Sequence, residues 1–470
     1  MTLSWKKVGK IFDASKLISD NPLSAGYAQS PQAVVLEDRV RVYFSTRLKE
    51  PGSSKFLSHV AFVDYSKDLK TTLGKNADQV IPLGELGCFD EHGIFPFSPF
   101  DDRGSLSAYS CGWSRRISVS VETATGYCMS ADKGQTFQKY GTGPIMASDM
   151  SEPFLVGDSF VRYFNGTYHM WYMFGERWMK ETETSAPDRV YKIGHAVSND
   201  GICWVRDHKQ IVTDQLHANE CQALPSVVYF NNQYHMVFCY RDIFGFRDNP
   251  EKAYRIGYAV SQDCRVWQRC DENLGLGLGR IGEWDGAMMC YPHLKIICGT
   301  LFLFYNGNRF GQEGFGVAIL QSSGLSYTQN ESRMWHLVSH FQSLDKAFKD
   351  ELLARTSIEE YTVKLVEKSC RYEVWDQDRL VGILAVYFNR ERMPFVYISN
   401  ISVLSDYQGK GIAKTLLSKL VDYARKSGLL YVELEVSADN NRAQAFYRKQ
   451  GFVEAERKTG ILKLRLNLSE

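Results

Sequence analysis

A short glycine loop, Gln408–Ala413, carries the clearest chemical signal in the sequence. It follows an apolar strand predicted over 396–403 and precedes a run of leucines and valine at helical spacing. The N–H groups at a helix start have no intrahelical partner, and with the helix dipole they favour an anion. The pattern predicts a phosphate site at Gly409 and Gly411, although a tight strand-to-helix turn explains the same hexapeptide.

A second group of chemically capable residues consists of acids that stand a few positions before a proline. Glycoside hydrolysis needs two carboxylates across the scissile bond, so three of these acids are candidate catalytic residues: Asp90, Glu220 and Asp285. The candidate sugar-binding residues are Glu91, His92, Glu152, Arg241, Arg247 and Arg309. The alternative is structural, because such acids also cap turns or pair with arginines that fasten neighbouring elements.

Internal repeats indicate which elements would position these acids. The segment 193–204 recurs at 256–267, and 164–170 recurs at 230–236. Each unit shows a strand, an Asn-rich turn, two further strands and a Ser-x-Asp turn, which predicts one four-stranded propeller blade. Five units are predicted, at about 31–73, 89–140, 150–207, 220–270 and 284–320. Equivalent positions would meet at one rim, so we expect at least three of Asp90, Glu91, Glu152, Glu220 and Asp285 to line a polar, sugar-sized pocket there.

The repeat style and these acids resemble the glycosidase-type five-bladed β-propellers, the superfamily of arabinanases, invertases and β-mannoside phosphorylases. The resemblance implies an aspartate next to proline on the first inner strand. This chain has Ser30 before Pro31 instead. Binding of a sugar is therefore expected to outweigh its hydrolysis.

The order Gln408-x-x-Gly411-x-Ala413, followed by Asn440-x-x-Ala443-x-x-Phe446-Tyr447-x-x-x-Gly451-Phe452, resembles the signature of the GNAT acetyltransferases. The resemblance implies an α+β domain with acetyl-CoA as its cofactor. It implies proton donation to the leaving thiolate by Tyr447, which could equally be a core aromatic residue. The general base stays open between Glu391 and a water near Asn400. The residues implied to hold acetyl-CoA are Ile401, Val403, Gln408, Gly409, Lys410, Gly411, Ile412, Ala413, Asn440 and Tyr447.

The composition limits the classes of function. With 470 residues, two or more domains are expected, and a net charge of +1 gives no bulk field that favours nucleic acid or membranes. No apolar run of membrane-spanning length and no signal-peptide core are seen, which predicts a cytoplasmic protein. The eleven scattered cysteines indicate reduced thiols, with no disulfide framework and no metal site.

The polar segment 322–330 predicts a boundary between a propeller at 1–328 and a GNAT domain at 329–470, in which 335–338 is expected to be the first strand. The predicted fold class is multidomain: an all-β five-bladed β-propeller followed by an α+β GNAT-fold domain. The leading hypothesis is an acetyl-CoA-dependent acyltransferase whose propeller recognises a sugar, with a small-molecule or carbohydrate substrate. The alternatives are a bifunctional glycoside hydrolase and acetyltransferase, or a propeller that only docks a partner. The oligomeric state is not predicted.

Overall fold

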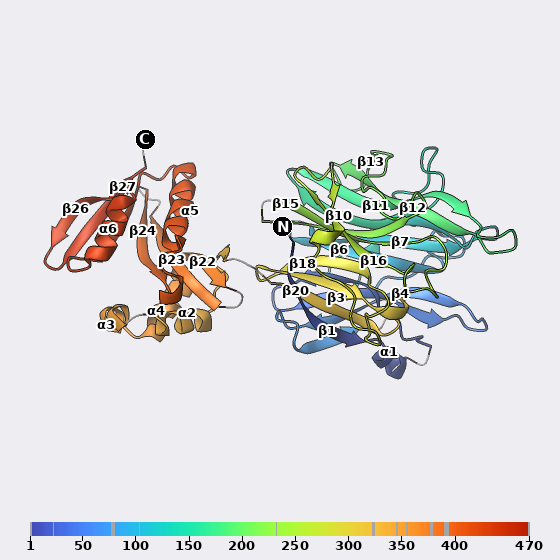
Figure 1. The fold of residues 1–470 in the computed structure, drawn as a ribbon, viewed down its shortest axis with the longest axis horizontal. Helices are drawn as coiled ribbons and strands as arrows, with labels where there is room; N and C mark the ends of the chain where they lie inside the picture. Colours follow the sequence, from blue (N-terminus) through green and yellow to red (C-terminus); the bar gives the residue numbers. More distant parts are fainter. Residues whose placement is uncertain are drawn as a thin grey trace. The chain divides into compact units, whose positions relative to one another are not determined.

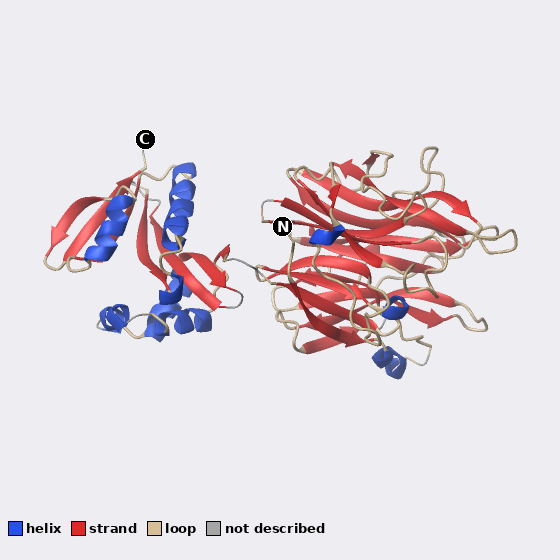
Figure 2. Ribbon diagram, viewed as in Figure 1, coloured by secondary structure: helices blue, strands red, loops and turns tan. Residues whose placement is uncertain are grey.

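The computed structural model describes residues 2–21, 23–76, 80–102, 104–231, 233–321, 325–344, 346–353, 356–376, 379–389 and 394–468. The chain forms two compact units, Met1–Gln321 and Ser322–Glu470. The first is built almost entirely of strands, whereas the second mixes strands and helices (Figure 2). No described helix has the length and apolar character needed to cross a membrane.

The first unit contains five four-stranded blades, coloured blue to yellow in Figure 1. A single residue pair, Ser58 with Gly93, joins the first two blades into one sheet. Each blade is antiparallel, and the buried side chains between neighbouring blades form the core. Blade one consists of β2 (Gln29–Val35), β3 (Val40–Lys49), β4 (Phe56–Tyr65) and β5 (Thr72–Asn76), and blade two of β6 (Gly93–Asp102), β7 (Ser105–Arg115), β8 (Val121–Ser130) and β9 (Gln138–Lys139). Blade three consists of β10 (Val156–Phe164), β11 (Thr167–Met179), β12 (Asp188–Ser198) and β13 (Val205–Arg206), and blade four of β14 (Cys221–Phe230), β15 (Gln233–Arg241), β16 (Arg255–Ser261) and β17 (Gln268–Arg269). Blade five consists of β18 (Cys290–Ile297), β19 (Thr300–Asn306), β20 (Gly314–Leu320) and β1 (Trp5–Asp13).

The innermost strands pack against one another in the order β2, β6, β10, β14 and β18, and β18 packs in turn against β2. This is the arrangement of a five-bladed β-propeller. The N-terminal strand β1 pairs antiparallel with β20, from Trp5 opposite Leu320 to Asp13 opposite Gly314. The predicted fifth unit, 284–320, lacks this outer strand, because β1 lies at the other end of the sequence.

The second unit is a seven-stranded sheet in the order β21-β22-β23-β24-β25-β27-β26, with helices packed on it. Only β24 and β25 run parallel among its described strands. Its strands are β21 (Ser326–Gln329), β22 (Cys370–Asp376), β23 (Arg379–Asn389), β24 (Phe395–Val403), β25 (Tyr431–Ser437), β26 (Val453–Lys458) and β27 (Ile461–Asn467). Its helices are α2 (Met334–Gln342), α3 (Lys346–Leu353), α4 (Ile358–Lys368), α5 (Ile412–Lys426) and α6 (Asn441–Lys449). The first unit holds one described α-helix, α1 (Ser15–Asp20), and two short 3-10 helices, η1 (Asp271–Asn273) and η2 (Asn308–Gly311).

The strand predicted at 335–338 is wrong, because this segment lies in α2. Leu337, His340 and Phe341 are buried at helical spacing, and the short apolar run did not distinguish a helix from a strand. The first strand of the sheet is instead β21, which pairs with β22. Residues 326–329 therefore belong to the second unit, and its first residues, 322–324, lie outside the described part of the chain.

Residues 322–470 expressed alone are expected to fold, whereas residues 331–470 are expected to be less stable. Removing β21 exposes the edge of β22 and the indole N–H of Trp375, which donates to Thr328 Oγ1 at 2.8 Å. Thermal unfolding of both fragments and of the full chain measures the difference. Equal unfolding midpoints for the two fragments would contradict a role for β21, and an insoluble 322–470 fragment would contradict an independent core.

Candidate functional site

The glycine loop lies where β24 ends and α5 begins, as the sequence predicts. Gly409 and Gly411 have φ values of +77° and +80°, which residues with a side chain rarely adopt. A Cβ built on either glycine would meet no atom within 4 Å, so the space in front of the loop is open. The loop is held from two directions. Gln408 Nε2 donates to the carbonyl oxygen of Val403 at 3.2 Å, and Arg442 Nη2 donates to Gln408 Oε1 at 2.8 Å.

The backbone of this loop presents unpaired donors. Within the described residues, no hydrogen bond uses the N–H groups of Gly411, Ile412, Ala413 or Lys414. Gly411 is the N-cap of α5, so these groups lie at the positive end of the helix dipole. Lys410 Nζ lies 4.5 Å from the centre of the Tyr407 ring, beside the loop. The arrangement suits a pyrophosphate, with fixed donors and open space in front of them.

The neighbouring strands separate next to the loop. Strands β24 and β25 pair only from Phe395 opposite Tyr431 to Ile398 opposite Leu434. Beyond this point β24 continues through Ile401 and Val403, and no described residue of β25 pairs with it there. One edge of β24 therefore presents backbone groups that an extended, amide-containing ligand can bind like an added strand.

The two other predicted cofactor residues lie at α6. Asn440 caps this helix, and its Oδ1 accepts the N–H of Ala443 at 3.0 Å. Tyr447 is 7% exposed and packs edge-on against Phe452. Burial raises the pKa of Tyr447 well above its usual value, so its hydroxyl holds a proton at neutral pH.

The candidate bases differ in what the structure describes. Glu391 lies outside the described residues. Asn400 is buried, and its Oδ1 accepts the hydroxyl of Ser402 at 2.9 Å. That hydroxyl also lies 3.0 Å from Nε2 of His340, and burial lowers the pKa of His340 to about 4. His340 is therefore neutral at physiological pH.

The first unit contains a cavity of about 940 Å³ near the beginnings of its innermost strands. Arg241, Arg247 and Arg309 line it, as expected of a sugar site. Further basic residues in its wall are Arg47, Lys55, Arg115 and Arg189, and its aromatic residues are Tyr27, Phe56, Phe95, Trp113, Tyr191, Phe246, Tyr254, Tyr291 and Phe310. The volume and the mixture of rings and charged groups are those of a site for a small molecule.

The predicted acids do not line this cavity, so the prediction that at least three of the five do so is wrong. Four of them, each 2% exposed or less, form ion pairs with a basic residue on the outermost strand of their own blade. We name these pairs the blade clasps: Asp90 with Lys139 at 2.5 Å, Glu152 with Arg206 at 2.9 Å, Glu220 with Arg269 at 2.6 Å, and Asp285 with Lys7 at 2.7 Å.

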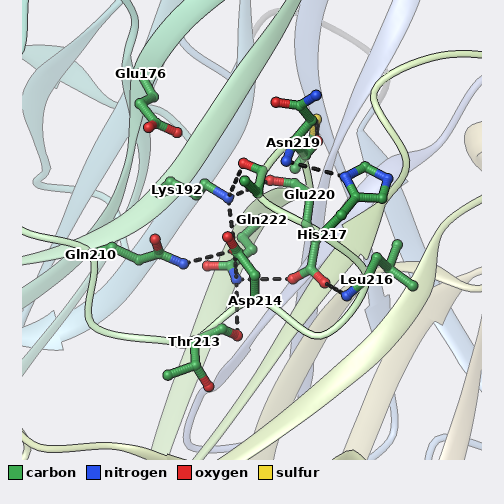
Figure 3. Close-up of polar contacts among 12 residues, drawn as sticks. Glu176, Lys192, Gln210, Thr213, Asp214, Leu216, His217, Asn219, Glu220 and Gln222 are labelled. Carbon is green, nitrogen blue, oxygen red and sulfur yellow. Dashed lines mark hydrogen bonds and ion pairs between the residues drawn. The ribbon is translucent and has the colours of Figure 1, made fainter.

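The carboxylate of Glu220 has further partners besides Arg269, several of which are drawn in Figure 3. Its Oε2 accepts the N–H groups of Gln215 and Leu216, each at 2.9 Å, and its Oε1 accepts from Gln222 Nε2 at 2.9 Å. Beside it, Lys192 Nζ lies 2.7 Å from Asp214 Oδ1. Every oxygen of this carboxylate is used internally. The structure thus favours the structural role for Asp90, Glu220 and Asp285 over the catalytic role.

The two remaining predicted sugar ligands, Glu91 and His92, also lie outside the cavity wall. They contact each other at 3.1 Å, and His92 stacks on Trp113, which does line the cavity. Burial and then the charge of Arg115 lower the pKa of His92. Of the two, only His92 contacts a residue of the cavity wall.

The bulge residues that four of the five inner strands present to the cavity were not predicted from the sequence. All five inner strands carry a β-bulge, whose first residue directly precedes a proline in four blades. These first residues are Ser30, Phe95, Asp158, Leu224 and Tyr291, and all except Ser30 line the cavity. Blade three has Ser159 in place of proline, so a search for acids before prolines passed over Asp158.

Asp158 is the one buried acid in the described cavity wall, and it is 8% exposed. Burial raises the pKa of Asp158 to about 7, against the lowering effects of the Arg189 charge and the Leu224 N–H group. Its φ of +52° is close to those of Ser30, Leu224 and Tyr291, so it is a feature of the bulge and not of the acid. A buried carboxyl group with a pKa raised toward neutrality is typical of a functional site.

Comparisons with known proteins identify the second unit. Residues 334–452 match the model of the Acetyltransferase (GNAT) family. Over 74 residues the chain is 43% identical to the N-alpha-acetyltransferase RimI of Mycobacterium tuberculosis, an alignment that covers 16% of this chain and 45% of that relative. The second unit is therefore a GNAT acyltransferase domain.

A longer match comes from the uncharacterized protein Rv1502 of Mycobacterium tuberculosis. It is 28% identical over 321 residues, which are 68% of this chain and all of that relative. Among solved structures, the BT0996 RGII complex aligns with a TM-score of 0.51 at 16% identity, covering 69% of this chain and 93% of that structure. Identity at this level shows a shared fold alone.

Proposed function

We propose that the protein is an acetyl-CoA-dependent N-acetyltransferase that acts on an amino sugar, a nucleotide-linked sugar or a glycan precursor, and that its propeller recognises the sugar. The observation that carries the proposal is the group of four unpaired N–H donors at Gly411–Lys414, placed beside the unpaired edge of β24 within the described residues. Acetyl-CoA needs both features, because it joins a pyrophosphate to an amide-containing arm.

Each residue then has a defined task. The loop Gln408–Ala413 holds the pyrophosphate, and Lys410 adds a positive charge next to it. The backbone of Ile401 and Val403 orients the pantetheine arm. When bound, acetyl-CoA would supply a thioester whose C–S bond breaks as the acyl carbon bonds to a neutral amine. Tyr447 would hold at its Oη the proton that the departing sulfur takes, and the proton lost by the amine nitrogen would restore the tyrosine.

The choice of a sugar as acceptor rests on the propeller cavity. Its aromatic rings offer the flat faces on which sugars stack, and its guanidinium groups offer donors for hydroxyl groups. Hydrolysis is not part of the proposal, because the blade clasps use the carboxylates that would perform it.

The test is the substitution Gly411→Val. The valine side chain would occupy the open space in front of the N–H donors. A residue with a side chain is also strained at the φ of +80° found at position 411, so the loop would shift. We expect acetyl-CoA affinity to fall at least tenfold, which is about 1.4 kcal/mol. Calorimetry measures binding, and mass spectrometry measures acetylated product from a panel of amino sugars.

Gly428→Val is the matched control. Gly428 follows the other end of α5 with a φ of +69°, and a Cβ there would also meet nothing within 4 Å. The backbone strain is therefore similar, but the loop is untouched. Unchanged acetyl-CoA affinity in folded Gly411→Val, or an equal loss in both variants, would contradict the proposed cofactor site. Wild-type protein that acetylates none of the amino sugars would contradict the proposed acceptor class.

A further inference from the structure

We propose that the propeller cavity binds a sugar that carries an anionic group, a phosphate or a carboxylate, and that Arg247 and Arg309 hold this group. This deepens the sugar-recognition part of the proposed function, and it does not depend on acetyl transfer. It rests on the excess of basic residues in the cavity wall, on the exposure of Arg247 and Arg309, and on the cavity's size.

The wall has a large excess of positive charge. It contains seven basic side chains, Arg47, Lys55, Arg115, Arg189, Arg241, Arg247 and Arg309, and two acidic ones, Asp158 and Asp248. A concave, weakly solvated site concentrates such a field, so an anion entering it is attracted from several sides. A neutral sugar gains little from this excess, whereas a phosphate or a carboxylate accepts two parallel N–H donors from one guanidinium group.

Internal partners neutralise only a part of this charge. Arg115 donates to Glu50 Oε2 at 3.0 Å, and three other guanidinium groups have one acidic partner between them. One carboxylate, Asp188, is shared by three guanidinium groups, with N–O distances of 3.7 Å to Arg189, 3.5 Å to Arg241 and 3.9 Å to Arg247. The other donors of Arg241 are used, because it donates to the hydroxyl groups of Tyr191 and Tyr254 and to two backbone carbonyls. Arg241 is therefore a fixed part of the wall, while Arg247 keeps donors for a ligand.

Arg247 and Arg309 are placed to receive the anion. The Arg247 side chain is 62% exposed, and its guanidinium carbon lies 4.3 Å from the centre of the Phe246 ring, which orients it. Arg309 forms no ion pair with a described residue. Arg309 and Phe310 both have a φ of +57°, a conformation that costs free energy for residues with side chains and that is concentrated at ligand sites.

The buried acid in the wall does not oppose this charge balance. Asp158 is in part protonated at neutral pH, since its pKa is about 7, and Arg189, Cys111 and the Leu224 N–H group lie against it. In this state its carboxyl group can donate to or accept from a sugar hydroxyl. The cavity volume of about 940 Å³ exceeds what a lone phosphate ion fills, and it suits one or two sugar rings with their charged group.

The test measures binding to the full chain by calorimetry at low salt, with four probes: glucose, glucose 6-phosphate, glucuronate and inorganic phosphate. We expect one of the charged sugars to bind at least tenfold more tightly than both glucose and inorganic phosphate. The two charged sugars distinguish a phosphate group from a carboxylate group. The double variant Arg247→Gln/Arg309→Gln is expected to remove the preference for the charged sugar. Both side chains are exposed, so this variant is expected to fold.

Arg265→Gln is the control, because Arg265 is an exposed arginine of the same propeller that does not line the cavity. It is expected to keep the preference. Four results would each overturn the inference. Two concern the sugars: equal affinity for glucose and the charged sugars, or no binding of any of them. The other two are a preference that survives in the double variant, and inorganic phosphate that binds as tightly as the charged sugars. Gly411→Val is expected to leave all four affinities unchanged, so a failure of acetyl transfer and a failure of this site give different results.

Discussion

Replacing Arg269 by leucine is expected to lower the free energy of unfolding of the propeller by about 3–5 kcal/mol. Arg269 is the clasp partner of Glu220 in the fourth blade, and Glu220 is fully buried. Without the guanidinium group a carboxylate stays in the interior with no countercharge, which costs far more than an exposed ion pair contributes. Denaturant unfolding followed by tryptophan fluorescence measures the change.

The expected loss depends on pH in a defined direction. Burial alone raises the pKa of Glu220, but the hydrogen bond from Gln222, the charge of Arg269 and the Leu216 N–H group lower it below its usual value. Because the pKa of Glu220 is lower in the folded state than in the unfolded state, its carboxylate stabilises the fold at pH values above the usual glutamate pKa. This stabilisation is lost as the pH falls through the pKa of the folded state. The difference between wild type and Arg269→Leu is therefore expected to be largest near pH 7 and to shrink below about pH 4.

Arg265→Leu, at an exposed position that takes no part in a clasp, is the matched control and is expected to change stability by less than about 0.5 kcal/mol. The double variant Glu220→Leu/Arg269→Leu is expected to recover much of the loss, because it removes the uncompensated charge. A single variant as stable as wild type would show that the clasp does not hold the blade together.

Replacing Tyr447 by phenylalanine is expected to lower kcat for acetyl transfer about 100-fold and to leave KM for acetyl-CoA nearly unchanged. The ring contact with Phe452 is kept, and no hydrogen bond links the Tyr447 hydroxyl to a described residue. Stability should therefore not change. Steady-state kinetics and thermal unfolding together distinguish a proton donor from a residue that only packs in the core. An unchanged kcat would show that Tyr447 only packs in the core. A large loss of stability would show that the fall in kcat comes from a damaged fold.

The GNAT domain was predictable because its signals are local. The glycine loop, the helix after it and Tyr447 lie within one stretch of sequence, and their geometry follows from residues close to one another along it. The wrong strand at 335–338 shows the limit of such reasoning. Leu337 and Phe341 reveal helical spacing only when the segment is extended to residue 342.

The propeller repeats predicted the blades but not the chemistry of the cavity. In sequence, Asp90 and Glu220 resemble residues that face a propeller channel. Only the structure shows that Lys139 and Arg269, on outer strands, form ion pairs with them. Asp158 was missed for the opposite reason, since its blade lacks the proline that marks the position. A sequence shows which residues repeat, whereas the partner of a buried charge is a property of the assembled blade.

The pairing of β1 with β20 has a consequence for biosynthesis. Trp5 lies opposite Leu320, so β1 finds its partner only after the rest of the propeller that separates them has been made. At about 5–20 residues per second this delay is roughly 15–60 seconds. During this time the edge of β1 can pair with other proteins, and Lys7 has no Asp285 to reach. Closure of the ring follows the synthesis of β20 and coincides with the emergence of the second unit, so the edge of β1 needs protection throughout the synthesis of the propeller.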